Sequence, residues 1–270
     1  MHCLILECDA PEKDLLAAEL WERGTEGIVE NDLPGERTRL QAFFADGTDQ
    51  AALTELFTAH GAVWERVEEV DWNARMRESW QAFPVGERFY LVPAWREDAA
   101  PEGRLRLEID PGMAFGTGTH ATTQLCMEAL ERVLRPEDRV LDLGTGSGIL
   151  ARAAAMLGAR SVVGCDIDVD AAGAALANIR KANLNISIFA GSARSVRAGS
   201  VDLLLANINA ETLVGLAGEM AGMLAAGGRA VVTGFTPLDR ERVAAALAGV
   251  RLTILEAREK DGWSALVCRR

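Results

Sequence analysis

The amino-acid sequence predicts an α/β protein with a doubly wound parallel sheet, preceded by a smaller α+β domain. Three observations support this fold class. From residue 101 onward, short apolar strand segments alternate with helical segments; a glycine-rich turn joins one such strand directly to a helix; and residues 1–71 show a different order of strands and helices. The 270 residues are enough for two domains with separate cores.

Residues 1–71 form the first expected domain. Their pattern predicts a strand at 1–9, a helix at 11–23, strands around 28–29 and at 38–45, a helix at 50–60 and a strand at 62–70. This order of elements is that of a ferredoxin-like domain. Because the segment has neither a glycine-rich turn nor a catalytic cluster, we interpret it as a recognition domain.

Residues 72–100 are expected to connect the two domains. The segment 71–83 is rich in tryptophan and arginine and predicts a helix, 88–92 predicts a strand, and 95–103 is typical of a loop. Tryptophan side chains of a freely flexible connector would have no surface to pack against. We therefore expect the aromatic residues of this segment to pack on the second domain.

Residues 101–270 form the second expected domain. A strand ending at Ile109 is followed by expected strands at 140–143, 161–166, 186–190, 201–206, 229–233, 251–258 and 263–269, and by expected helices at 124–134, 149–157, 169–182, 211–225 and 238–248. The dipeptide Asp261-Gly262 between the last two strands is typical of a two-residue hairpin. One of these two strands must therefore run antiparallel to the others.

A glycine-rich turn at 144–148 follows the strand 140–143 in the stretch VLDLGTGSGIL. Glycine adopts positive φ without strain, and the missing Cβ lets a ligand lie against the backbone at a helix N-terminus. A dinucleotide fingerprint would need its third glycine at position 149, which is Ile149. Asp166 ends the next strand, where a carboxylate can accept hydrogen bonds from both hydroxyls of a ribose.

The segment 110–123, DPGMAFGTGTHATT, is rich in glycine and threonine and has few side chains that could pack in a core. It is therefore expected to be a loop that folds over another surface. Two interpretations are open. It is either a surface loop in which Thr119 or Thr122 caps the following helix, or a lid over a cofactor, with Phe115 stacking and Thr123 forming a hydrogen bond.

The net charge of -12 is concentrated at one end of the chain. Residues 1–71 hold 17 acidic and 5 basic residues, whereas the remainder holds 23 of each. An acidic domain repels nucleic acid and attracts basic partners, although an acidic surface also serves solubility alone. The five cysteines and three histidines show no metal-ligand spacing. Without an apolar run of ~20 residues or a signal peptide, the chain is expected to be cytoplasmic, with no membrane contact and no metal.

The glycine-rich turn followed by Asp166 resembles the class I S-adenosylmethionine-dependent methyltransferases. Together with DPGMAFGTGTHATT and with Asn207-Ile208-Asn209-Ala210 at the next strand end, the sequence closely resembles the methyltransferase family that modifies ribosomal large-subunit protein eleven. This resemblance covers nearly the whole chain. It implies a Rossmann-like class I methyltransferase domain, a small N-terminal domain that captures the substrate, S-adenosyl-L-methionine as cofactor, and the basic ribosomal protein as partner.

The resemblance also implies the site residues. The expected contacts with S-adenosylmethionine are Thr123, Gly144, Asp166 and Asn207, with Phe115, Gly116, Gly146 and Ser192 nearby. Asn207 is expected to be the catalytic residue that orients the acceptor amine, and its alternative role is to cap the following helix. The family commonly carries an apolar residue where this chain has Asn209, so the role of Asn209 is open.

The family methylates amines, both lysine side chains and the N-terminal α-amine. A dedicated base is not required, because a nearby sulfonium and partial desolvation lower the pKa of the amine. Three other functions are weighed: methylation of a nucleobase or small-molecule amine, nicotinamide-dependent oxidoreduction, and binding without catalysis. Nucleobase amino-methyltransferases have two prolines and an aromatic ring after the Asn or Asp, which residues 207–210 lack. We expect a monomer that makes no direct contact with nucleic acid.

Overall fold

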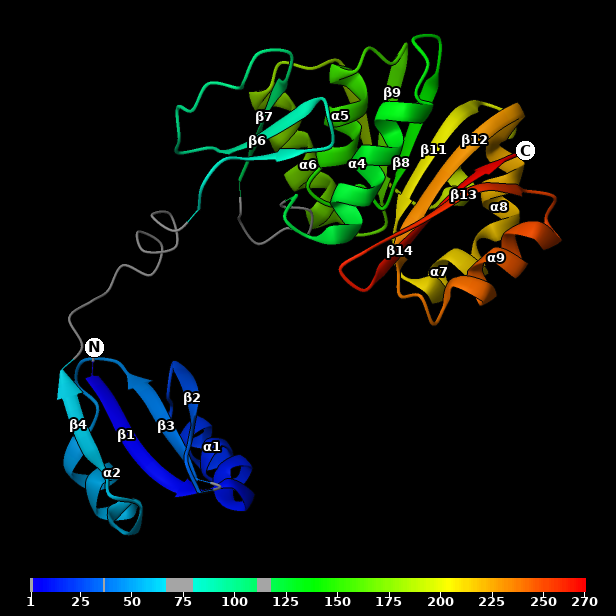
Figure 1. Cartoon of the computed structure of the whole chain (residues 1–270). Helices are drawn as coiled ribbons and strands as arrows, with labels where there is room; N and C mark the ends of the chain where they lie inside the picture. Colours follow the sequence, from blue (N-terminus) through cyan, green and yellow to red (C-terminus); the bar gives the residue numbers. More distant parts are fainter. Residues whose placement is uncertain (1, 36, 67–79, 111–117) are drawn as a thin grey trace. The chain divides into compact units, whose positions relative to one another are not determined.

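A computed structural model of the chain describes residues 2–35, 37–66, 80–110 and 118–270. The chain divides into two compact units, Met1–Ser79 and Trp80–Arg270 (Figure 1). Each unit has its own core, because the buried side chains of the first unit form one cluster and those of the second form two others. Among the described residues, no helix has the length and apolar character that crossing a membrane would require.

The first unit is a four-stranded antiparallel sheet with the strand order β2-β3-β1-β4. Its elements are β1 (His2–Asp9), a 3-10 turn (Ala10–Glu12), α1 (Lys13–Glu22), β2 (Gly27–Leu33), β3 (Arg37–Phe44), α2 (Gln50–Leu56), a 3-10 turn (Thr58–His60) and β4 (Val63–Arg66). The order of the elements confirms the expected ferredoxin-like pattern. Alternate residues of β1 and β3, such as Leu4, Leu6 and Leu40, are fully buried, so one face of the sheet carries the core.

The second unit contains a seven-stranded sheet with the order β10-β9-β8-β11-β12-β14-β13. The strands are β8 (Arg139–Leu143), β9 (Ser161–Asp166), β10 (Ile186–Ala190), β11 (Val201–Asn207), β12 (Leu224–Phe235), β13 (Thr253–Lys260) and β14 (Trp263–Arg269). All neighbouring pairs are parallel except those made by β14, which runs antiparallel to β12 and β13. Asp261 and Gly262 both have positive φ, as the predicted two-residue hairpin requires.

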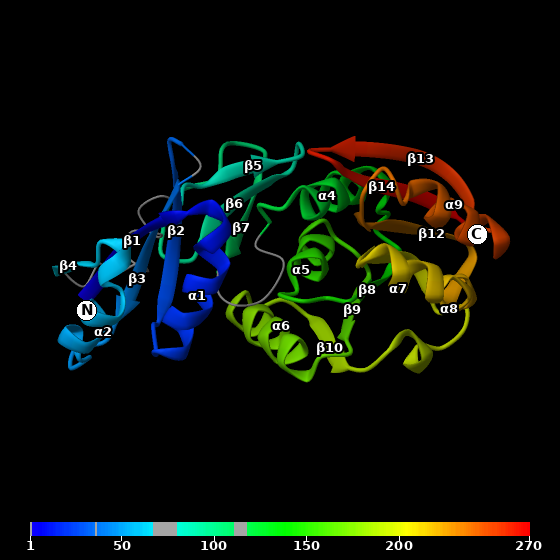
Figure 2. The same ribbon diagram turned by 90° about the horizontal axis from the view of Figure 1, so that it is seen from below.

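Helices cover both faces of this sheet (Figure 2). They are α4 (Ala121–Val133), α5 (Ile149–Met156), α6 (Val169–Lys181), α7 (Ala210–Gly215), α8 (Ala217–Met223) and α9 (Arg240–Gly249). One buried cluster contains side chains of α4, α5 and α6, and the other contains side chains of α7, α8 and α9. Leu203 belongs to the first cluster and its neighbour Leu204 to the second, because successive residues of a strand point to opposite faces.

A second, three-stranded sheet of order β5-β6-β7 packs on the same core as α4 and α5. Its strands are β5 (Phe83–Val85), β6 (Phe89–Pro93) and β7 (Leu105–Ile109). Residues 80–93 therefore belong to the second unit, which differs from the expected connector at 72–100 and the expected domain start at 101. Trp80 and Phe83 pack against the core, as expected for the aromatic residues of this segment.

Three local predictions differ from the structure. The helix expected over 71–83 cannot include its last residues, because Phe83 starts a strand; residues 67–79 lie outside the described part. The helix expected over 211–225 is divided into α7 and α8 at Leu216, and β12 begins at Leu224. The helix α4 is capped by His120, whose side chain accepts a hydrogen bond from the Thr122 amide, and not by Thr119 or Thr122.

Candidate active site

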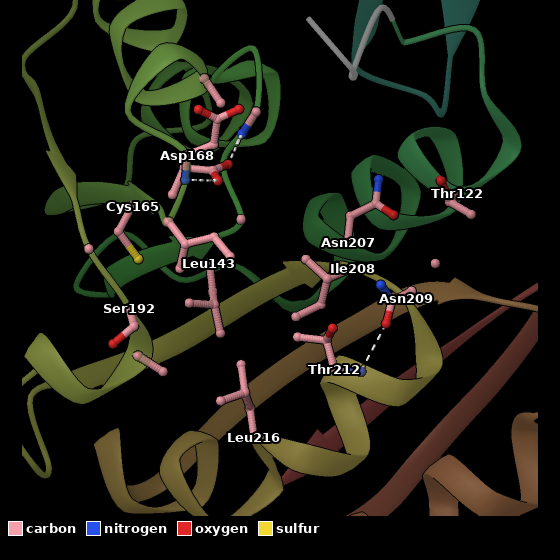
Figure 3. Close-up of a pocket in the computed structure, with 18 of the residues that line it drawn as sticks. Thr122, Leu143, Cys165, Asp168, Ser192, Asn207, Ile208, Asn209, Thr212 and Leu216 are labelled. Carbon is pink, nitrogen blue, oxygen red and sulfur yellow. Dashed lines mark hydrogen bonds between the residues drawn. The ribbon is translucent and has the colours of Figure 1, made fainter.

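A cavity of about 960 Å³ lies at the carboxyl ends of the central strands of the seven-stranded sheet (Figure 3). Ligands of open α/β sheets bind at this edge, and the volume is in the range of small-molecule sites. In Figure 3, Cys165, Asp168 and Ser192 lie on one side of the cavity, and Thr122, Asn207 and Asn209 lie on the other. Five of the residues expected in the site line this cavity, namely Gly144, Gly146, Asp166, Ser192 and Asn207.

The glycine-rich turn forms the floor of this cavity between β8 and α5. Gly144, Gly146 and Gly148 have φ values of 72°, 52° and 80°, a region that favours glycine. A Cβ on Gly144 would lie 2.5 Å from Cγ2 of Ile208, and a Cβ on Gly234 would collide with the backbone of the same Ile208. Ile208 is therefore enclosed by two glycines, with Gly144 against its side chain and Gly234 against its backbone, and neither position has room for a side chain.

Asp166 ends β9 beside this turn. Its carboxylate accepts hydrogen bonds from the amides of Gly146, at 3.0 Å, and Asp168, at 3.1 Å. These two bonds hold the turn against the end of β9. A carboxylate offers about four acceptor positions, so Asp166 can accept further hydrogen bonds from a ligand in the cavity. The apolar side chain of Ile167 follows it along the cavity wall and is 81% exposed.

Asn207 ends β11 on the opposite side of the cavity. Its Nδ2 donates to Oγ1 of Thr123, at 3.4 Å. Thr123 is fully buried and does not line the cavity, whereas its neighbour Thr122 does. This arrangement leaves the Oδ1 of Asn207 free to accept a hydrogen bond from a bound amine, because Nδ2 is committed to Thr123. The expected site residues Phe115 and Gly116 lie outside the described residues.

Asn209 lines the cavity and also caps α7. Its Oδ1 accepts a hydrogen bond from the amide of Thr212, at 2.9 Å. The capping role that the sequence offered as the alternative for Asn207 is therefore filled by Asn209. Asn207 is left available for the cavity.

Two aromatic side chains of the cavity were missed by the sequence analysis. His120 and Trp263 pack edge to face, with ring centroids 4.7 Å apart, and both line the same cavity as Asn207. The His120 ring is held by Oγ1 of Thr122, at 2.7 Å from its Nδ1. Trp263 is the first residue after the Asp261-Gly262 turn, so its position depends on the pairing of β14, which no local pattern reveals.

Asp142, within the VLDLGTGSGIL stretch, was also missed. It is 1% exposed, and its Oδ2 accepts hydrogen bonds from Oγ1 of Thr145, at 2.7 Å, and from the amide of Ala151, at 3.1 Å. Its Oδ1 accepts no hydrogen bond from any residue in the described part of the chain. Burial raises the pKa of Asp142 to about 6, and the two hydrogen bonds oppose this shift only in part. The sequence did contain a signal that could have identified Asp142, because a carboxylate is unusual inside a strand that is predicted to be buried on both faces.

The raised pKa of Asp142 predicts a pH dependence of stability. The folded protein holds this proton up to about pH 6, whereas the unfolded chain releases it near pH 4, so the contribution of Asp142 to the free energy of unfolding falls as pH rises between these values. The difference between the folded and unfolded pKa values of Asp142 lowers the free energy of unfolding at pH 7 by about 3 kcal/mol relative to strongly acidic pH. Asp142→Asn should remove this dependence while retaining an acceptor for the Ala151 amide.

Urea unfolding of wild type and Asp142→Asn at pH 4.5 and pH 7.5 measures this effect. The variant should gain stability relative to wild type at the higher pH, and the difference between the two proteins cancels the contributions of all other titrating groups. Parallel pH profiles would show that Asp142 has an ordinary pKa.

A family model described as ribosomal protein L11 methyltransferase (PrmA) matches residues 12–270. A protein of that name from Symbiobacterium thermophilum is 41% identical over 88% of this chain and 77% of its own length, and one from Cupriavidus taiwanensis is 36% identical over 96% and 86%. The crystal structure of ribosomal protein L11 methylase from Lactobacillus delbrueckii subsp. bulgaricus superposes with a TM-score of 0.66 at 34% identity, covering 71% of this chain and 99% of that one.

Proposed function

Because the chain belongs to the ribosomal protein L11 methyltransferase family, we propose that it transfers methyl groups from S-adenosyl-L-methionine to amines of ribosomal protein L11. The amines are lysine side chains and the N-terminal α-amine. One observation carries the proposal: the glycine-rich turn with Asp166, which suits an adenosyl group, and Asn207, which suits an amine, border the same cavity.

The residues of the cavity fit the proposed cofactor. The bare backbone at Gly144 and Gly146 admits close contact, Asp166 retains acceptor capacity for ribose hydroxyls, and the apolar side chain of Ile167 offers a surface for an adenine ring. The carboxylates of Asp166, Asp168 and Asp170 line the same side and favour a positively charged ligand. The bound cofactor supplies the electrophilic methyl group.

The acceptor amine must be neutral to attack this methyl group. At pH 7, removing a proton costs roughly 4 to 5 kcal/mol for a lysine of pKa about 10.4 and about 1 kcal/mol for an α-amine of pKa about 8. A nearby sulfonium charge and desolvation both lower these costs. The Asn207 side chain then acts by orientation: Thr123 holds Nδ2, and Oδ1 accepts a hydrogen bond from the remaining N–H of the amine, which directs the lone pair.

The His120 and Trp263 rings form an aromatic part of the wall of the cavity that Asn207 also lines. An aromatic surface contacts the methylene chain of a lysine and also stabilises a cationic methylated amine. Both properties suit an amine acceptor that becomes a cation when it receives each methyl group.

The acidic first unit is proposed to capture the basic substrate. Its net charge of -12 over residues 1–71 contrasts with the neutral remainder, and a basic ribosomal protein is attracted to it while RNA is repelled. We further propose that the enzyme acts in the cytoplasm, as a monomer and without direct contact to nucleic acid.

Deleting residues 1–79 should separate substrate capture from cofactor binding. The remaining unit has its own two buried clusters, so we expect its affinity for S-adenosylhomocysteine, measured by calorimetry, to be unchanged. Methylation of intact L11 should fall to background, as measured by transfer of radiolabelled methyl. A thermal melt of the truncated protein controls for folding, and retained activity toward L11 would remove the docking role.

Mass spectrometry tests the proposed function directly. Purified L11 incubated with enzyme and cofactor should gain 14-Da increments, about the mass of one methylene each, on peptides containing lysine or the N-terminus. Ribosomal RNA incubated in parallel should gain none. A thermal shift with S-adenosylhomocysteine but not with NAD separates this function from a nicotinamide-dependent one, and methylated RNA with unmodified L11 would contradict the proposal.

A further inference from the structure

A second cavity, of about 210 Å³, lies behind the glycine-rich turn and shares no residue with the main cavity. Its walls are the end of β7, the helix α5 and the last turn of α6, and its charged or amide side chains are Arg106, Glu108, Asp110, Arg152, Asn178 and Lys181. Asn178 connects it to the turn, because its Nδ2 donates to the carbonyl oxygen of Ser147 at 2.9 Å.

The unusual feature of this second cavity is Arg152. The residue lies in the middle of α5, among Leu150, Ala151, Ala153 and Ala154, and is only 7% exposed. Its Nε is fully buried and has no hydrogen-bond partner among the residues that the structure describes. The carboxylate whose charge acts on this guanidinium is that of Glu108, which also pairs with Arg106. A guanidinium remains charged at neutral pH, so its burial without a partner of its own is costly.

The other charges around the second cavity are already balanced. Arg106 donates to the carbonyl oxygens of Arg96 and Asp98 and lies 3.4 Å from the carboxylate of Glu108. Lys181 pairs with Asp110 at 3.8 Å. With these two pairs formed, the charged side chains that line the cavity carry a net charge of +1, because Arg106, Arg152 and Lys181 face only Glu108 and Asp110, and Arg152 shares the charge of Glu108 with Arg106.

We propose that this second cavity is a binding site for a small oxyanion, with the Arg152 guanidinium as its principal ligand. An oxyanion accepts two parallel N–H bonds from a guanidinium, which is the geometry that arginine favours. The volume lies below the range of about 300 to 1,000 Å³ that is typical of sites for drug-sized ligands, so it suits a phosphate or a carboxylate group with a few waters, and not a nucleotide. Glu108 and Asp110 at the wall limit the charge of the ligand and favour a monoanion.

Binding there would join α5 and α6 behind the glycine-rich turn without entering the methyl-transfer cavity. The site is therefore independent of the proposed methyl transfer, and its test requires no activity measurement. The probes are inorganic phosphate and acetate, each compared with sodium chloride at equal ionic strength. The full chain is used, with S-adenosylhomocysteine present to fill the main cavity.

The experiment compares wild type with Arg152→Met and, as a matched control, Arg160→Met, because Arg160 is exposed and follows the same helix. In chloride, Arg152→Met should melt at or above the temperature of wild type, since the substitution removes a buried charge that Glu108 compensates only in part. Phosphate or acetate should raise the melting temperature of wild type and of Arg160→Met but not of Arg152→Met. The affinity of Arg152→Met for the anion should fall at least tenfold by calorimetry.

Amide hydrogen exchange on wild type keeps the test decisive if Arg152→Met does not fold. The anion should slow exchange in residues 149–156 and 169–181 beyond the effect of chloride. A response to phosphate alone assigns a phosphate-bearing ligand, and a response to acetate alone assigns a carboxylate-bearing one. A wild type that responds to neither anion, or an equal response in a folded Arg152→Met, overturns the proposal.

Discussion

Asn207→Ala is expected to reduce the turnover of L11 methylation by about a hundred- to a thousandfold, the range found when an orienting hydrogen bond of a reacting group is removed. The reason is geometric. Thr123 holds the Nδ2 of Asn207, so its Oδ1 is the group that can align the lone pair of the amine with the methyl group. Alanine leaves the cavity open but removes this alignment.

A single-turnover assay with radiolabelled cofactor measures this loss, and calorimetry with S-adenosylhomocysteine measures cofactor affinity separately. The affinity should change less than tenfold. Asn185→Ala serves as the control, because Asn185 is exposed and outside the cavity. Unchanged turnover in Asn207→Ala would assign the orientation of the amine to another group, and a loss of cofactor affinity equal to the loss of turnover would make Asn207 a cofactor ligand only.

Asp166→Ala is expected to weaken S-adenosylhomocysteine binding by about a hundredfold or more. A hydrogen bond to a charged acceptor contributes about 1.5 to 3 kcal/mol, and the loss of two such bonds to the ribose hydroxyls exceeds the 2.7 kcal/mol that corresponds to about a hundredfold in affinity. The same carboxylate also accepts the amides of Gly146 and Asp168, so its removal loosens the turn on which the cofactor rests.

Isothermal titration calorimetry gives the affinity of Asp166→Ala, and its melting temperature without ligand should stay within a few degrees of wild type. Glu241→Ala is the control, because Glu241 is an exposed carboxylate in the first turn of α9 and lies outside the cavity. A cofactor affinity equal to that of wild type would exclude Asp166 as the ribose ligand.

The parts of the fold that local sequence patterns decide were predicted correctly. Buried strands such as 140–143, the glycine-rich turn and the Asp261-Gly262 hairpin each have a backbone requirement that few residues satisfy. The domain boundary was placed some twenty residues too late, because β6, the partner of β5, pairs with β7 only across the loop at 95–103. A strand whose partner is distant in sequence gives a weak local signal.

The residues of the candidate site that follow from the sheet topology could also be predicted from the sequence. Gly144, Asp166 and Asn207 follow strands whose ends meet at one edge of a parallel sheet, so the topology brings them together. Trp263 enters the cavity through an antiparallel strand, and His120 through a helix cap, so neither contact follows from that topology. Arg152 was assigned to an apolar helix, and only the packing of β7 and α6 around it reveals that its charge is compensated only in part.

The enclosure of Ile208 between Gly144 and Gly234 also limits how this enzyme can be redesigned. Both glycines face the same isoleucine, but a side chain at position 144 would meet the side chain of Ile208, whereas one at position 234 would meet its backbone. A smaller residue at position 208 could therefore compensate a substitution of Gly144 but not one of Gly234. A library intended to broaden the range of accepted amines should therefore vary position 208 before either glycine. Variation that begins at the glycines would instead produce proteins with steric conflict at Ile208 and with side chains at positions of positive φ.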